Sequence, residues 1–223
     1  MRRYDLVIFD FDGTVADTKR DLADATNHTL AALDLPPHDV EEVARFVGGG
    51  LKLLLKRALG PHGEDPAMLE RALAVFRPYY KVHMMDATRP YPGTVEMLDA
   101  IAAAGLVSAI ATNKPRLFTG DLVPGIFGDR FHPVIACGSS ADDDAPRKPD
   151  PVCVAMCRAI HAAVPAERVV FVGDSVVDIE TARNAGLDVV SVTWGYAARE
   201  KLLARSPRWV ADDNAALQRI LLG

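Results

Sequence analysis

The sequence has few cysteines, no long apolar run and no excess of basic residues, and each shortage excludes a class of protein. Its 223 residues include three cysteines, an odd number whose spacing predicts no disulfide framework. No apolar run approaches the roughly 20 residues that a membrane-spanning helix needs. The formal net charge is −5, and acids and bases are mixed along the chain, which argues against the basic face that nucleic-acid binding requires.

The start of the chain and the cysteines indicate neither a targeting signal nor a zinc site. Arg2 and Arg3 are basic, but the apolar run behind them is too short for a signal peptide, and acidic residues follow at once. We therefore expect a cytoplasmic protein. Cys153 and Cys157 stand four residues apart in a predicted helix and could share a metal. No second His or Cys pair completes a zinc set, so we expect both to be small core residues.

The distribution of apolar residues predicts an α/β fold. Hydrophobic residues make up 49% of the chain, which is enough for a real core. Short runs rich in Val and Ile are typical of buried parallel strands; they cover residues 6–9, 106–111, 134–137, 169–172 and 189–192. Helical patterns lie between most of them, at residues 94–104, 151–162 and 177–185. This alternation predicts a Rossmann-like, doubly wound parallel sheet.

One long segment interrupts the alternation. Between residues 16 and 86 the pattern is helical throughout, with apolar faces in residues 19–33, 40–46, 51–59 and 65–84. Pro78 is expected to kink or split the last of these helices. The sequence thus predicts a Rossmann-like core of residues 1–15 and 87–223 and an inserted helical cap of residues 16–86. Such an insertion lies over the carboxyl end of the first strand, where open α/β sheets bind ligands.

Two carboxylates follow the first predicted strand. Asp10 and Asp12 are two residues apart, so on a strand they point to the same face, and Gly13 ends the strand. Crowded carboxylates repel each other, and a divalent cation with hard oxygen ligands, such as Mg²⁺, offsets that repulsion. A solvated Asp-Gly turn is the alternative for this motif taken alone.

Acidic residues also follow the strand at residues 169–172. Asp174 comes directly after this strand, and Asp178 lies four residues further on, at the start of a predicted helix. Either could be a helix cap. Because parallel strands end at the same edge of a sheet, however, two acidic strand ends together indicate a site and not a stability device.

Groups that bind phosphate follow at two further points. Thr112, Asn113 and Lys114 come after the strand at 106–111, and a Thr hydroxyl beside backbone N–H groups can hold a phosphate oxygen. Lys148 stands in a loop before a helix. A lone lysine is most often a solvated surface charge, but this one supplies the cation that a cluster of acids and phosphate requires.

Taken together, four motifs resemble those of the haloacid dehalogenase superfamily. They are "DFDGT" at 10–14, "ATNK" at 111–114, "RKPDP" at 147–151 and "VGDSVVDIETARNAG" at 172–186. Their order and spacing match over nearly the whole chain, and the helical insertion after the first motif resembles the subfamily with a four-helix-type cap. The resemblance implies a Mg²⁺-dependent phosphohydrolase with a modified Rossmann core.

The resemblance also implies a role for each matching residue. Asp10 would be the nucleophile that forms an aspartyl-phosphate, and Asp12 the general acid and then the base that activates water. Lys148 would neutralise the transferring phosphoryl group. The implied phosphate-binding residues are Thr14, Thr112, Asn113 and Lys148, and the implied Mg²⁺ site consists of Asp10, the Asp12 backbone carbonyl, Asp174 and Asp178, with Asp178 orienting Lys148 or a metal-bound water.

Within the superfamily, an acid at position 12 favours phosphate ester hydrolysis over dehalogenation. Several short segments, such as "VGGGL" at 47–51 and "TWGY" at 193–196, are similar to phosphoglycolate phosphatases. The implied substrate is 2-phosphoglycolate or another small phosphorylated metabolite. Gly48, Gly49 and Gly50 would then form a substrate-specificity loop in the cap. Arg45, Lys52 and Lys56 are the cap cations nearest to it, although each is more often a plain surface charge.

Other functions stay open at this stage. A different HAD phosphatase, for a sugar phosphate, nucleotide or pyrophosphate, has the same four motifs. A phosphomutase is disfavoured because mutases tend to have a Ser-Ala type sequence in place of "TNK", and a non-catalytic scaffold would not need four acids. Asp142, Asp143 and Asp144 are expected to form a solvated loop and not a second metal site. We expect a monomer or homodimer.

Overall fold

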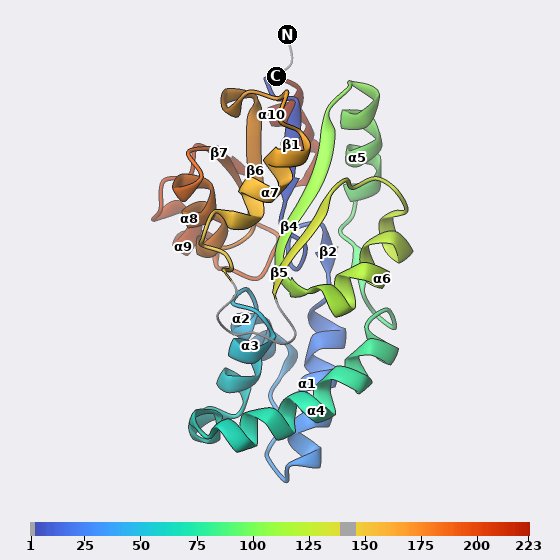
Figure 1. Ribbon diagram of the computed structural model, residues 1–223, viewed down its shortest axis with the longest axis vertical. Helices are drawn as coiled ribbons and strands as arrows, with labels where there is room; N and C mark the ends of the chain where they lie inside the picture. Colours follow the sequence, from blue (N-terminus) through green and yellow to red (C-terminus); the bar gives the residue numbers. More distant parts are fainter. Residues whose placement is uncertain (1–2, 139–145) are drawn as a thin grey trace.

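The core of the protein is a parallel sheet with helices on both faces. The computed structural model describes residues 3–138 and 146–223, so the acidic residues Asp142–144 lie outside the described residues. Six parallel strands pair in the order β5-β4-β1-β6-β7-β8 (Figure 1). They are β1 (Leu6–Phe9), β4 (Val107–Pro115), β5 (Val134–Gly138), β6 (Val169–Gly173), β7 (Asp188–Val192) and β8 (Trp209–Ala211). The predicted fold class is confirmed.

The buried strands form because both faces of the sheet are covered. In β1, Val7 and Phe9 pack into one apolar cluster, and Leu6 and Ile8 pack into the other. The first cluster lies under α5 (Thr94–Ala103), α6 (Arg116–Phe127) and α10 (Asn214–Leu222). The second lies under α7 (Val152–Ile160), α8 (Val176–Asn184) and α9 (Arg199–Leu203). Strands covered on both sides read as continuous apolar runs, which is why the sequence pattern revealed them.

The segment between β1 and the rest of the sheet is helical. It contains α1 (Lys19–Ala32), α2 (Val40–Phe46), α3 (Leu51–Ala58) and α4 (Pro66–His83), with a short 3-10 helix at Gly60–Glu64. These helices gather beyond one end of the sheet, opposite the end at which the C-terminal helix α10 lies (Figure 1). The two connections to the core pair as short antiparallel strands, β2 (Ala16–Asp17) and β3 (Arg89–Pro90). The Asp21 carboxylate adds hydrogen bonds from the backbone N–H groups of Ala87 and Thr88.

Pro78 does not split α4, contrary to one alternative drawn from the sequence. The helix runs unbroken from Pro66 to His83 with Pro78 inside it. Phe76 and Tyr80, on either side of the proline, are fully buried, and their packing holds the helix together across the missing N–H donor. Tertiary burial here outweighs a local helix-breaking signal.

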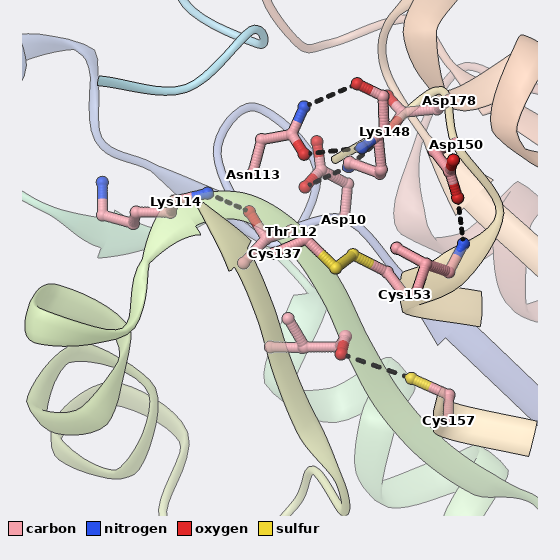
Figure 2. Close-up of a disulfide and its surroundings, with 12 residues drawn as sticks. Asp10, Thr112, Asn113, Lys114, Cys137, Lys148, Asp150, Cys153, Cys157 and Asp178 are labelled. Carbon is pink, nitrogen blue, oxygen red and sulfur yellow. Dashed lines mark hydrogen bonds and ion pairs between the residues drawn. A yellow bond between two sulfur atoms is a disulfide. The ribbon is translucent and has the colours of Figure 1, made fainter. Parts of the chain in front are cut away.

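The expectation of no disulfide is wrong. Cys137, near the end of β5, and Cys153, in the first turn of α7, form a disulfide with their Cα atoms 6.0 Å apart (Figure 2). Strand β5 and helix α7 pack side by side, which brings together two residues that are 16 apart in sequence. Cys157 is a free and buried core residue, as expected, and its thiol donates to the Ile110 carbonyl.

Within residues 3–138 and 146–223, no helix combines the length and the apolar composition that crossing a bilayer requires.

Candidate active site

The carboxyl end of β1 places Asp10 at the centre of the sheet edge. Strand β1 lies between β4 and β6, and the Asp10 amide continues the ladder by donating to the Val172 carbonyl at 2.9 Å. The chain then turns sharply at Gly13, whose φ of 84° is a left-handed conformation that favours glycine. The strands of this sheet that follow β1 along the chain, β4 and β5, lie on one side of it, and the later strands, β6, β7 and β8, lie on the other side. Asp10 therefore lies at the switch point of the sheet, where α/β folds bind ligands.

Three buried carboxylates meet at this point. One oxygen each of Asp10, Asp174 and Asp178 lies within 4.8 Å of the others. Burial raises the pKa of Asp174 to about 8, with further contributions from the charges of Asp178 and Asp10. Burial likewise raises the pKa of Asp10 to about 6, against the lowering effect of Lys148. Burial and the neighbouring carboxylates thus both disfavour the charged forms of Asp10 and Asp174.

Lys148 is the cation of this cluster. Its Nζ lies 2.7 Å from Asp10 Oδ1 and 2.8 Å from Asp178 Oδ1, and its side chain is almost completely buried. Asn113 fixes the lysine backbone, because its Oδ1 accepts from the Lys148 N–H at 2.8 Å and its Nδ2 donates to the Lys148 carbonyl at 3.0 Å (Figure 2). Asn113 thus orients Lys148 from the end of the neighbouring strand.

Asp178 is held by the start of its own helix. Ser175 caps α8 by accepting from the Asp178 N–H, and the Asp178 carboxylate accepts from the Ser175 N–H in return. The Ser175 hydroxyl donates to the same carboxylate at 2.6 Å. With one oxygen held by Ser175 and the other by Lys148, Asp178 chiefly orients the lysine.

Asp174 lies in a pocket formed by backbone. Its carboxylate accepts from the Thr14 hydroxyl at 3.1 Å and from the Tyr196 N–H at 2.7 Å. A Cβ added to Gly13 or Gly195 would collide with this carboxylate, so both positions need glycine. Thr14, predicted to bind phosphate, donates a hydrogen bond to Asp174 and is itself buried.

The Asp12 carboxylate has partners of its own, separate from those of the other three acids. Its Oδ1 accepts from the Thr18 hydroxyl at 2.6 Å and from Lys114 Nζ at 2.9 Å. Asp12 does not belong to the carboxylate cluster that could hold a metal. The Asp12 carboxylate therefore stands apart from that cluster and is paired with Thr18 and Lys114.

Two hollows border Asp10 and Asp12. The first, called the inner hollow, lies toward the helical segment, and its lining includes Gly48, Gly50, Tyr80, Thr112 and Lys114. The second, called the outer hollow, opens toward solvent between Asp174 and residues of the helical segment. Of the residues predicted to bind phosphate or substrate, Thr112, Asn113, Gly48 and Gly50 line the inner hollow, and Gly49 lines neither hollow.

The loop of Gly48, Gly49 and Gly50, called the glycine loop, joins α2 to α3 and is hydrogen-bonded to the core. The Asn113 Nδ2 donates to the Gly48 carbonyl at 2.9 Å. Gly48 and Gly50 have left-handed φ angles of 107° and 88°. At Gly49 the backbone is ordinary, and a Cβ would meet only the flexible end of the Leu53 side chain.

The three candidate cap cations lie in different surroundings. Arg45 lines the outer hollow together with Asp10, Asp12 and Lys201 of the core. Lys52 lies 3.8 Å from Glu70, and Lys56 lies 2.8 Å from Glu64, and neither lysine lines a hollow that contains Asp10. Of the three, only Arg45 lines a hollow that contains Asp10.

The sequence pattern gives no role to several residues at this site. Lys114 belongs to the "TNK" motif, but the motif predicts no contact for it, and no pattern assigns a role to Thr18, Tyr80 or Tyr196. Tyr196 accepts from the Thr18 N–H at 2.8 Å, and Tyr80 lies 2.8 Å from Lys114. The one signal in the sequence is Lys114 itself, because a lysine at the end of a buried strand needs an acidic partner.

Comparison with known proteins agrees with this geometry. Residues 7–192 match the family described as haloacid dehalogenase-like hydrolase. The chain is 36% identical over 218 residues to a phosphoglycolate phosphatase of Agrobacterium fabrum, covering 95% of this chain and 90% of the relative. It is 37% identical to one from Rhodospirillum rubrum, covering 95% and 88%. A crystal structure from Haemophilus somnus, described as a predicted phosphoglycolate phosphatase, superposes with a TM-score of 0.88 at 28% identity and covers 99% of both chains.

Proposed function

Because the chain belongs to the haloacid dehalogenase-like hydrolases, as its motifs predicted, we propose that it is a Mg²⁺-dependent phosphatase for small phosphate monoesters, 2-phosphoglycolate above all. The observation that carries the proposal is the buried group of Asp10, Lys148, Asp174 and Asp178 at the switch point of the sheet. The names of the relatives support the choice of substrate.

The residues at the site fit a magnesium ion. Three buried carboxylates share a space where their oxygens can meet, and only Lys148 among the described residues is a cation in contact with them. Hard carboxylate oxygens with few protein ligands suit Mg²⁺. Asp10, Asp174 and the Asp12 carbonyl would hold the ion, with Asp178 beside them. When bound, it neutralises negative charge on the carboxylates and on the phosphoryl group.

Asp10 acts as the nucleophile in this proposal. The ordinary carboxylate is a weak nucleophile, and here it is held rigidly by the strand end and by Lys148. Its oxygen attacks phosphorus, the bond to the leaving alcohol breaks, and an aspartyl-phosphate forms. Lys148 neutralises charge on the phosphoryl oxygens in a site that is largely closed to water, where such contacts are strong.

Asp12 transfers the protons. It is close to Asp10 in sequence and lines both hollows, so its carboxylate can reach the leaving oxygen. It gives a proton to that oxygen in the first step and takes one from water in the second, when the aspartyl-phosphate is hydrolysed. The two roles need one carboxylate that is held in place but is not bound to the metal.

The size of the inner hollow favours a substrate with a small leaving group. The volume of the hollow is about 40 Å³, and its walls are mostly apolar, with Lys114 as a cation. That space holds a few water molecules or a group of similar size, and a sugar or a nucleoside would require the helices to withdraw. Arg45 at the outer hollow can meet the carboxylate of 2-phosphoglycolate. Phosphatases for larger esters are the second candidate.

The test is a comparison of phosphate esters. We expect hydrolysis of p-nitrophenyl phosphate that requires Mg²⁺, and a kcat/KM for 2-phosphoglycolate that exceeds those for sugar phosphates, nucleotides and pyrophosphate. Absence of any Mg²⁺-dependent hydrolysis would refute the phosphatase, and a higher kcat/KM for a large ester would refute the substrate. Return of the phosphoryl group to a sugar would indicate a mutase.

We further propose that residues 16–86 are a cap that moves as a unit over the site. The hinges would be residues 15–17 and 86–90, which include the paired strands β2 and β3. A closed cap excludes water during phosphoryl transfer, and an open cap admits substrate. Labels at the exposed residues Val82 and Leu203 would follow this motion by energy transfer. Identical transfer with and without Mg²⁺ and a phosphate analogue would contradict it.

A further inference from the structure

Asp12 is held by two donors that no metal or phosphate role requires. Thr18 and Lys114 both contact Oδ1, at 2.6 and 2.9 Å. The Lys114 side chain is 3% exposed and that of Asp12 is 11% exposed, so the ion pair is well shielded from water. Among the described residues, no contact to the second oxygen, Oδ2, accompanies these two. One oxygen of Asp12 is therefore fixed, and the other is left for chemistry.

Lys114 is held in turn by a residue of the helical segment. Tyr80 of α4 lies with its hydroxyl 2.8 Å from Lys114 Nζ, and its ring faces the same ammonium at 4.8 Å. Tyr80 is fully buried, and burial raises its pKa to about 12, so it stays a neutral hydroxyl. A chain of contacts thus joins helix α4 to the Asp12 carboxylate through one lysine.

The position of this chain argues against a purely structural ion pair. Buried ion pairs are often no more stable than apolar residues of the same size, so a stability role alone is a weak reason for one. Asp12, Lys114 and Tyr80 all line the inner hollow, on the side where a leaving group would lie. Their contacts set the direction of a carboxylate that must deliver a proton there.

We propose that Lys114 is a positioning residue for proton transfer by Asp12, and that Tyr80 links this positioning to helix α4. The proposal rests on the proposed phosphatase function. As the Asp10 oxygen bonds to phosphorus and the bond to the leaving oxygen breaks, the proton on Asp12 Oδ2 passes to that leaving oxygen. Lys114 and Thr18 hold Oδ1, so Oδ2 faces the hollow at the required moment.

The dependence on the leaving group tests this role. An alkoxide such as that from 2-phosphoglycolate needs the proton, whereas p-nitrophenolate leaves without one at neutral pH. The ratio kcat/KM covers the steps up to departure of the leaving group. Lys114→Met should therefore lower kcat/KM about 100-fold for 2-phosphoglycolate, a loss within the range of general acid catalysis. For p-nitrophenyl phosphate the loss should be less than about tenfold. Tyr80→Phe should show the same bias with a smaller loss.

Two neighbours on the same helix serve as matched controls. Lys81 also joins α4 to the core, through an exposed contact with Asp121, and Tyr79 stacks on His28. Lys81→Met and Tyr79→Phe should leave the ratio of the two kcat/KM values unchanged. Thermal unfolding should show that all four variants fold, and if Lys114→Met does not, Tyr80→Phe, which loses only a hydroxyl, decides.

Two results would overturn the inference. An equal loss on both esters in Lys114→Met and Tyr80→Phe would give the chain a structural role only. A rise in KM confined to esters that carry a carboxylate, with no leaving-group bias among the others, would make Lys114 a substrate contact. Failure of the wild-type protein to hydrolyse any ester would refute the proposed function itself, which separates the two cases.

Discussion

The two sides of the candidate active site are built in different ways. On the sheet side, Asp10, Asp174 and Lys148 follow strand ends or adjoining loops and are fixed by buried hydrogen bonds and ion pairs. On the helical side, the glycine loop, Tyr80 and Arg45 come from a separate group of helices, which meets the core through polar contacts and through apolar packing such as that of Tyr80 against Phe118. In the proposed function, this arrangement keeps the reacting groups in place on the sheet side and leaves selection of the substrate to the helical side.

The largest effect is expected on the sheet side, from Asp10→Asn. The amide keeps the size and most contacts of the side chain but is a poor nucleophile, so kcat should fall by about 10³-fold or more with Mg²⁺ at saturation. Thermal unfolding should show an intact fold. A variant that kept a tenth of the wild-type kcat would remove Asp10 from the centre of the chemistry.

Asp174→Asn should change the pH dependence of stability in the metal-free protein. The raised pKa values of Asp174, about 8, and Asp10, about 6, lie above the ordinary value of 3.8. The native state therefore holds more protons than the unfolded chain between about pH 4 and pH 8, and stability falls as the pH rises through that window. With EDTA present, Tm should drop from pH 5 to pH 8, and Mg²⁺ should restore it at pH 8.

The matched variant sharpens this result. Asp174→Asn removes the more strongly shifted group, so its Tm should vary less with pH and respond less to Mg²⁺ than that of the wild type. If Tm varied equally with pH in the two proteins, Asp174 would not be the cause of the pH dependence of stability.

On the helical side, effects should be smaller and specific to substrate. Arg45 is exposed, and an exposed ion pair contributes up to about 1 kcal/mol. Arg45→Met should therefore raise KM for 2-phosphoglycolate by about two- to fivefold and leave p-nitrophenyl phosphate unaffected. Lys56→Met is the control, because Lys56 is paired with Glu64 away from both hollows. A change in Lys56→Met equal to that in Arg45→Met would exclude a direct contact.

The disulfide should affect stability and hardly affect turnover. Cys137 and Cys153 enclose the loop that carries Lys148, but Asn113 fixes that lysine by separate hydrogen bonds. Closing a loop of this length stabilises by about 3 kcal/mol, so reduction with dithiothreitol should lower Tm by several degrees. The rate should change less than about twofold. In Cys137→Ser the reductant should leave Tm unchanged, and a reductant effect there would assign the shift to another cause.

The sequence predicted the sheet side far better than the helical side. Buried parallel strands read as apolar runs, and polar residues that end such runs meet at one edge, so Asp10, Asp174 and Lys148 could be placed together without coordinates. The edge strand β8 escaped because it has only three residues, Trp209–Ala211, and is partly exposed. The apolar runs and the polar residues that end them are therefore sufficient to predict this side of the site from the sequence.

Contacts across the two regions could not be predicted in the same way. The Lys114–Tyr80 contact joins residues 34 apart on different elements, and the Asn113–Gly48 contact joins residues 65 apart. Neither leaves a periodic signal. The Cys137–Cys153 pair depends on how β5 packs on α7, which an odd cysteine count conceals. The direction of the Thr14 hydroxyl toward Asp174 likewise follows from a turn and not from a motif.

The most direct test of the account is to locate the phosphoryl group during turnover. Asp12→Asn should still react with p-nitrophenyl phosphate, whose leaving group needs no proton, but it lacks the base that hydrolyses the intermediate. Acid quenching followed by peptide mass spectrometry should then find phosphate on Asp10 in Asp12→Asn and none in the Asp10→Asn variant. Phosphate on another residue, or release of p-nitrophenol with no phosphorylated peptide at all, would contradict the covalent mechanism on which the account depends.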